Sequence, residues 1–150
     1  MDTAIPDFAF VEAKELRIVL EDYRDQTQRA LVGKCHLGTI VGWGSLVEGL
    51  LTWALLRREK EALASNKASK DKQGGVRPLR EWSLTNLIDV CGELGLIGRT
   101  ARQASSALKD FRNFIHPYNV LKQSARPDPA LAMSAVAAVI EIRRSVQLHM

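Results

Sequence analysis

The stretch CHLGTIVGWGSLVEGLLTWALL, at residues 35–56, is almost unbroken in its apolar character and decides the fold. A helix that is apolar all round is buried on most sides, by neighbouring helices or by a second subunit. The stretch is also long enough to cross a membrane. His36 and Glu48 argue against a span, because a lone helix in lipid would leave the Glu48 carboxylate uncompensated. We therefore predict a central buried helix and no membrane partner.

Four glycines lie in this stretch, at Gly38, Gly42, Gly44 and Gly49. Each glycine weakens a helix by about 1 kcal/mol relative to alanine, and close packing against another backbone is the natural compensation. We expect a homodimer that forms through this glycine-rich helix and through the end of the fourth predicted helix.

The flanking segments predict a long first helix and an exposed basic loop. The first helix is expected over about residues 7–31, where apolar positions recur at spacings of three and four. The second helix is expected to continue to about residue 64. Residues 65–80, SNKASKDKQGGVRPLR, lack periodicity and predict an exposed, mobile loop. The positions that define the first helix face are Leu16, Val19, Leu20, Tyr23, Thr27 and Ala30.

Three further helices are predicted towards the C-terminus. Ser83 is a good N-cap for a short third helix, which Gly95 ends. A fourth helix has an apolar seam with coiled-coil spacing, and Pro117 is expected to end it. Asp128 as N-cap and Pro129 at the first helical position open the last helix. The seam consists of Ala101, Ala104, Leu108, Phe111 and Ile115.

These segments predict a single all-α domain over residues 1–150, an up-and-down helical bundle of four longer helices plus one short helix. The composition, 46% hydrophobic and 25% charged, excludes a disordered or fibrous chain. Between residues 57 and 80 there are eight Lys or Arg and three acids, a local charge of +5. This asymmetry favours an anionic partner such as RNA, and the alternative is a solvated loop kept soluble by its lysines.

The cysteines and histidines give no sign of a metal site or a cofactor. Cys35 and Cys91 lie in apolar helical patterns and are expected to be buried free thiols, as in a reducing cytoplasm. His36, His116 and His149 are too scattered for a metal site, and no phosphate-binding or dinucleotide-binding glycine loop is present. The acidic N-terminus does not have the pattern of a secretory signal, so we expect a cytoplasmic location.

The chemically distinctive segment is Arg112-Asn113-Phe114-Ile115-His116-Pro117-Tyr118. On a helix, side chains four residues apart lie on the same face, so Arg112 and His116 are expected side by side. A guanidinium binds phosphate oxygens with two parallel hydrogen bonds, and an imidazole exchanges a proton near pH 7. RNA cleavage without a metal needs two groups. One group deprotonates a 2′-hydroxyl, and the other stabilises charge on phosphate oxygens.

Residues 112–118, RNFIHPY, resemble the signature of the HEPN superfamily, small helical-bundle proteins of prokaryotes. The wider pattern resembles an uncharacterised bacterial branch of that group, with Gly44, Ser45 and Glu48 on one helix. It continues with WSLTNLIDVCGELGLI at 82–97 and LKDFRNFIHPY at 108–118. The resemblance spans about residues 35–120, and the Arg-Asn…His element is its specific part.

The resemblance implies a homodimer in which two Arg/His motifs meet and, in active members, a metal-independent endoribonuclease of a defence or toxin–antitoxin system. Arg112 would then bind and polarise phosphate, His116 would act as acid and base, and Asn113 would orient them. Tyr118 would match a tyrosine that a partner antitoxin nucleotidylates in one toxin branch. The spacing departs from the common family pattern, because only three residues separate Arg112 from His116.

The alternative is a non-enzymatic helical interaction module in which Arg112 and His116 are structural. Glu48 lies inside the apolar stretch and needs a cation, and Arg112 is the first candidate. His116 would then cap a helix C-terminus. The leading hypothesis is a nucleic-acid-related domain with Arg112, Asn113 and His116 as catalytic residues and Glu48 and Tyr118 as supporting residues.

Overall fold

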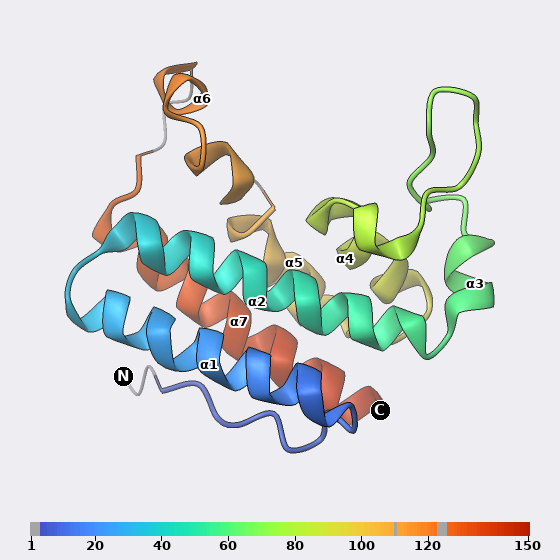
Figure 1. Cartoon of the computed structure of the whole chain (residues 1–150), viewed down its shortest axis with the longest axis horizontal. Helices are drawn as coiled ribbons and strands as arrows, with labels where there is room; N and C mark the ends of the chain where they lie inside the picture. Colours follow the sequence, from blue (N-terminus) through green and yellow to red (C-terminus); the bar gives the residue numbers. More distant parts are fainter. Residues whose placement is uncertain (1–3, 110, 123–125) are drawn as a thin grey trace.

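The computed structural model describes residues 4–109, 111–122 and 126–150 (Figure 1). Within these ranges the chain is all-helical apart from an isolated antiparallel bridge between Lys70 and Val76, which confirms the all-α class. The α-helices are α1 (Lys14–Val32), α2 (His36–Leu56), α3 (Glu59–Leu63), α4 (Leu84–Glu93), α5 (Arg99–Ala104), α6 (Pro117–Lys122) and α7 (Pro129–His149). Short 3-10 helices are η1 (Leu79–Glu81), η2 (Ser105–Ala107) and η3 (Phe111–Phe114).

Helix α2 is the centre of the fold, as its apolar sequence predicts. It contacts α1, α7 and α4, and its side chains make up much of the buried core. Figure 1 shows α1 running back along α2, with α7 lying along α2 in the same direction as α2. By length and composition α2 could also cross a membrane, yet 61% of its most apolar window is buried inside the protein. Burial by neighbouring helices accounts for the apolar sequence.

The first helix begins later than predicted, because residues 4–13 form an extended strap. Phe8 and Val11 are fully buried, and Arg143 of α7 donates from its Nε to the Asp7 carbonyl at 2.7 Å. The Arg143 guanidinium carbon also lies 5.2 Å from the centre of the Phe10 ring. Burial against the last helix therefore overrides the helical spacing that the sequence has in this region.

The second helix also ends earlier than predicted. The chain leaves the helical conformation at Arg58, whose φ and ψ are −133° and 43°, before α3 begins. This turn lets Nη1 of Arg58 donate to the Leu94 carbonyl at 2.7 Å, at the end of α4. The end of α2 is thus accompanied by a long-range hydrogen bond from Arg58 to the Leu94 carbonyl, which lies at a helix C-terminus where carbonyls lack partners within the helix.

The prediction of a long fourth helix that ends at Pro117 is wrong. The chain in this region is divided into α5, η2, η3 and α6. Pro117 opens α6 and does not end a preceding helix. The predicted seam is buried at Leu108 and Phe111, whereas Ile115 is 51% exposed. Asp110, within this segment, lies outside the described residues. The described chain thus has three long helices, α1, α2 and α7, and several short ones.

The predicted start and end of the third helix and the predicted start of the last helix are confirmed. Ser83 Oγ accepts from the Asn86 N–H at 3.2 Å, and Asn86 Oδ1 accepts from the Ser83 N–H, which forms a capping box. Gly95, after α4, has a φ of +72°, a conformation that glycine adopts readily. Asp128 Oδ1 accepts from the Leu131 N–H at 2.8 Å at the start of α7.

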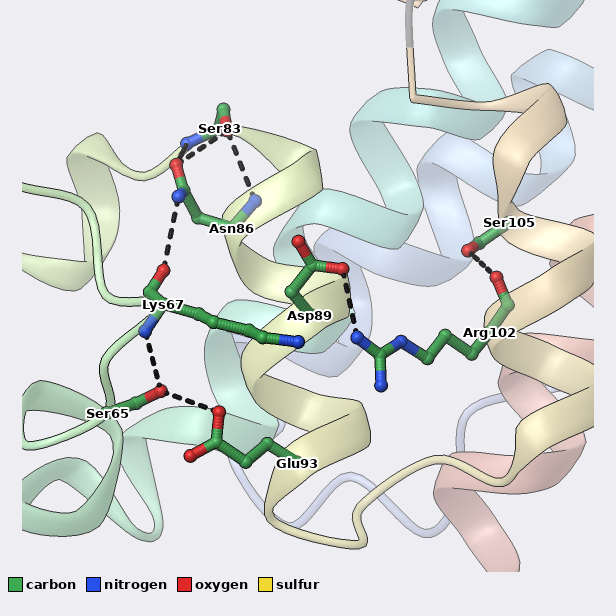
Figure 2. Close-up of polar contacts among 8 residues, drawn as sticks. All are labelled: Ser65, Lys67, Ser83, Asn86, Asp89, Glu93, Arg102 and Ser105. Carbon is green, nitrogen blue, oxygen red and sulfur yellow. Dashed lines mark hydrogen bonds and ion pairs between the residues drawn. The ribbon is translucent and has the colours of Figure 1, made fainter.

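Residues 65–80, here called the basic hairpin, are mostly exposed, as predicted, although Ser65, Ala68 and Leu79 are buried. The segment is also tied together by hydrogen bonds. The Arg77 N–H donates to the Ser69 carbonyl at 2.8 Å. At its base, the Ser65 hydroxyl donates to the Glu93 carboxylate of α4 at 3.0 Å, as Figure 2 shows. The Trp82 indole donates to the Arg77 carbonyl at 2.8 Å. The first arm of the hairpin is therefore attached to α4, and the second arm to Trp82, which precedes α4.

The glycines of α2 pack against this chain's own side chains. A Cβ built on Gly42 would overlap Thr27 of α1, and one built on Gly44 would overlap the ring of Phe111. A Cβ on Gly49 would meet only Leu20 Cδ2, at an ordinary 3.5 Å. At Gly42 and Gly44 the close neighbours are thus side chains of the same chain, and not the second backbone that the glycines were expected to admit.

We expect Gly44→Ala and Gly49→Ala to have opposite effects on stability. Gly44→Ala forces the Phe111 ring from its place and should lower the free energy of unfolding by about 1–3 kcal/mol. Gly49→Ala meets no obstacle and should raise it by up to about 1 kcal/mol through helix propensity. Urea unfolding followed by far-ultraviolet circular dichroism measures both, and equal effects of the two variants would contradict the packing described.

The two cysteines differ in exposure, so the prediction that both are buried is wrong for Cys35. Cys35 precedes α2 in the turn after α1 and is exposed, whereas Cys91 on α4 is fully buried and both are free thiols. Burial raises the pKa of the Cys91 thiol to about 12. The unfolded thiol ionises near its ordinary pKa of about 8.5, so the stability that the neutral buried thiol contributes is lost as pH rises above that value.

In the folded protein near pH 8, a thiol reagent should therefore modify Cys35 quickly and Cys91 only on unfolding. Counting the modified thiols over time with an aromatic disulfide gives the measurement. Cys35→Ser should remove the fast phase and leave the slow one. Two thiols that react at the same rate would show that Cys91 is accessible.

Candidate functional site

A groove of about 850 Å³ lies over α2, between α1 and the segment around η3. Most of its lining is apolar, with a small group of polar and charged side chains. Apolar concave surfaces with a few converging polar groups are the usual form of a binding site. The polar and charged side chains that line it are Tyr23, Ser45, Glu48, Thr52, Arg80, Arg112 and His116.

Glu48 and Arg112 form an ion pair in this groove, as the sequence predicts. Nη2 of Arg112 lies 2.5 Å from Oε1 of Glu48, and the two side chains are 55% and 23% exposed. The second carboxylate oxygen, Oε2, is buried and has no hydrogen-bond partner among the described residues. The carboxylate thus holds the guanidinium by one oxygen only.

Arg112 is placed by the residue before it. Phe111 is buried with its ring against Gly44, which fixes η3 to the middle of α2 four residues before Glu48. The Arg112 guanidinium carbon lies 6.0 Å from the centre of the same ring. Only Nη2 has a protein acceptor in the described part of the chain, so the other N–H donors are available to a ligand.

His116 also lines the groove, but its backbone setting differs from the predicted one. Its carbonyl accepts from the Asn119 N–H at 2.9 Å, so it lies immediately before α6 and does not cap a preceding helix C-terminus. Its side chain is exposed and has no hydrogen-bond partner among the described residues. The His116 imidazole is therefore accessible to solvent and to a ligand.

The structure brings Glu48, Arg112 and His116 together and leaves two predicted site residues apart. Asn113 is half-buried and does not line the groove. Tyr118 is 80% exposed and lies over a neighbouring apolar hollow with Phe114 and Leu121. Tyr118 could therefore support the site only from outside the groove.

Sequence reasoning missed two side chains of the groove. Tyr23 belongs to the apolar stripe of α1 and was expected in the core, yet it is 44% exposed and lines the groove. Arg80 was grouped with the basic hairpin, and its side chain also lines the groove. The signal for Tyr23 was its hydroxyl, because a phenol on an apolar stripe tends to lie at the edge of a core.

Comparison of the chain with models of protein families, with curated proteins and with solved structures finds no match. The described residues also hold no group of three or more His, Cys, Asp or Glu side chains suited to a metal ion. The chemistry of the groove must therefore be argued from its own residues.

We expect the Glu48–Arg112 pair to contribute little to stability, because Arg112 is more than half exposed. In a double-mutant cycle with Glu48→Gln and Arg112→Met, the coupling energy should be below about 1 kcal/mol. Urea unfolding of the four proteins gives this value. A coupling well above that range would assign Arg112 a mainly structural role and would weaken its candidacy as a ligand-binding group.

Proposed function

We propose that this chain is a HEPN-like, nucleic-acid-related domain that cleaves single-stranded RNA without a metal ion. The observation that supports this function best is the placement of Arg112 and His116 in one open groove. One side chain is a permanent cation with unused planar donors, and the other is an unpaired imidazole. These are the two chemical groups that a transphosphorylation of RNA requires.

In the proposed reaction, His116 accepts the proton of a ribose 2′-hydroxyl, and the 2′-oxygen attacks the adjacent phosphorus. The bond from phosphorus to the 5′-oxygen of the next nucleotide breaks, and that oxygen takes up a proton from the His116 imidazolium through solvent water. The products are a 2′,3′-cyclic phosphate and a 5′-hydroxyl end. Arg112 donates to the phosphate oxygens on which charge increases, and Glu48 is a positioning residue for the guanidinium.

The test is cleavage of a labelled single-stranded RNA by the purified protein in EDTA. His116→Ala should lower the rate by about 100-fold or more, because loss of a general base typically costs that much. The fold should be unaffected, since the His116 side chain is exposed and makes no hydrogen bond. His149→Ala is the matched control, because His149 lies outside the groove and should leave the rate unchanged.

The cleavage products and the Arg112→Lys variant provide two further tests of the proposed chemistry. Arg112→Lys keeps the charge but loses the planar donors, so cleavage should fall while the melting temperature stays near the wild-type value. Cleavage that leaves a 5′-phosphate, or that EDTA abolishes, would contradict the proposed chemistry. Cleavage equally fast in His116→Ala would point to a contaminating nuclease.

A second function is favoured by a different observation, the exposed apolar side chains around the groove. Val19 is 50% exposed, Ile115 is 51% exposed and Leu121 is 67% exposed. Exposed apolar surface of this kind is typical of protein contacts, including the homodimer that we expected from the sequence. If the wild-type protein is inactive on RNA, the non-enzymatic interaction module becomes the better proposal.

A further inference from the structure

The basic hairpin presents several cations on a folded segment. Residues 65–80 contain five Lys or Arg and one acid, and Figure 1 shows the hairpin standing away from the helices beside α3 and α4. Its arms are joined at Lys70 and Val76 and by the hydrogen bond from Arg77 to Ser69. A preformed segment has less conformational entropy to lose when a ligand binds to it.

Asp71, the single acidic residue of the hairpin, accepts hydrogen bonds from backbone N–H groups of the turn. Oδ1 of Asp71 accepts the N–H groups of Gln73 and Gly75, each at 2.9 Å. The neighbouring Lys70 and Lys72 are exposed and have no acidic partner among the described residues. Their charges are therefore available to an external anion.

Lys67 has a different orientation from these two lysines. In Figure 2 its side chain extends across α4 towards Asp89. Its carbonyl accepts from the Asn86 side chain at 3.3 Å, which attaches the base of the hairpin. We therefore assign Lys67 to the attachment of the hairpin and leave it out of the ligand surface.

Arg80 connects the hairpin with the groove. It follows Leu79, which is buried and fixes η1, and the Arg80 side chain lines the same groove as Arg112 and His116. Arg80 has no ion-pair partner among the described residues. Exposed cations are therefore present at the hairpin tip, at Lys70 and Lys72, and in the groove that holds the candidate site, at Arg80.

We propose that a single-stranded nucleic acid lies along the basic hairpin and enters the groove past Arg80, so that one phosphate reaches Arg112 and His116. This inference rests on the proposed function and adds a second binding surface, with its direction of approach. The hairpin residues 65–80 contain no aromatic side chain, so the contacts are to phosphates and do not depend on base sequence.

A flexible single strand fits this path better than a duplex. Duplex DNA is stiff over about 150 base pairs and cannot bend from the hairpin into a groove of this size at small cost. An acidic protein would need carboxylates at matching fixed positions, whereas a polyanion offers a phosphate at every nucleotide. The repeating charge therefore favours a nucleic acid as the occupant.

The test is the salt dependence of binding to labelled oligo(U), measured by fluorescence anisotropy in a His116→Ala background that prevents cleavage. For single strands, each phosphate contact contributes about 0.7 to the slope of log K against log salt concentration. Lys70→Gln with Lys72→Gln should therefore reduce the slope by about 1.4, and Arg80→Gln by about 0.7. All three changes should also weaken binding at low salt.

The matched control is Arg29→Gln with Arg99→Gln, which removes two exposed cations outside the hairpin and the groove. Its slope should stay near that of the background protein. An equal loss in the control, unchanged slopes in the hairpin variants, or tighter binding of a duplex or of polyglutamate than of oligo(U) would each overturn the inference.

A second readout separates this inference from the proposed cleavage. In proteins that retain His116, Lys70→Gln with Lys72→Gln should slow cleavage of a long oligo(U) at low substrate concentration, whereas Arg29→Gln with Arg99→Gln should leave that rate unchanged. Hairpin-dependent binding without any cleavage would overturn the catalytic proposal and leave the binding surface in place. Cleavage without hairpin-dependent binding would do the reverse.

Discussion

The ring of Phe111 packs directly against the backbone of α2 at Gly44, and the arrangement of the groove depends on that contact. Only a residue without a Cβ allows an aromatic ring to lie this close to a helix. The contact fixes η3 against α2 although the chain on both sides of η3 is only briefly helical. Because Arg112 follows Phe111 directly, the same contact determines where the guanidinium meets Glu48.

The ion pair in the groove has two effects on a ligand. The Glu48 carboxylate holds the Arg112 guanidinium at one nitrogen, which limits the number of conformations that binding must select. It also offsets part of the positive charge that would attract a phosphate. Arg80 in the groove, and the lysines of the basic hairpin outside it, add positive charge that the pair does not cancel.

Much of the fold was predictable where the sequence carries a strong local signal. The apolar run of α2, the Ser83 capping box and the Asp128-Pro129 start of α7 each depend on neighbouring residues, and the structure has all three. The pairing of Glu48 with Arg112 was also predictable, because a carboxylate in an apolar helix requires a cation.

The remaining features depend on contacts between distant residues, which periodicity does not record. Arg143 holds the strap at Asp7, so helical spacing before residue 14 gave a helix that starts too early. The apolar spacing from Ala101 to Ile115 likewise predicted one continuous helix, whereas the chain forms the separate short helices α5, η2 and η3. In the site, Tyr23 and Arg80 came into the groove through tertiary packing alone.

The strap has a consequence for the order in which the chain folds during synthesis. Its hydrogen bond joins residues 136 positions apart, so Phe8 and Val11 cannot reach their final places until most of α7 has left the ribosome. Until then the nascent chain exposes two large apolar side chains near its beginning. The strap is thus among the last of the described segments to become ordered.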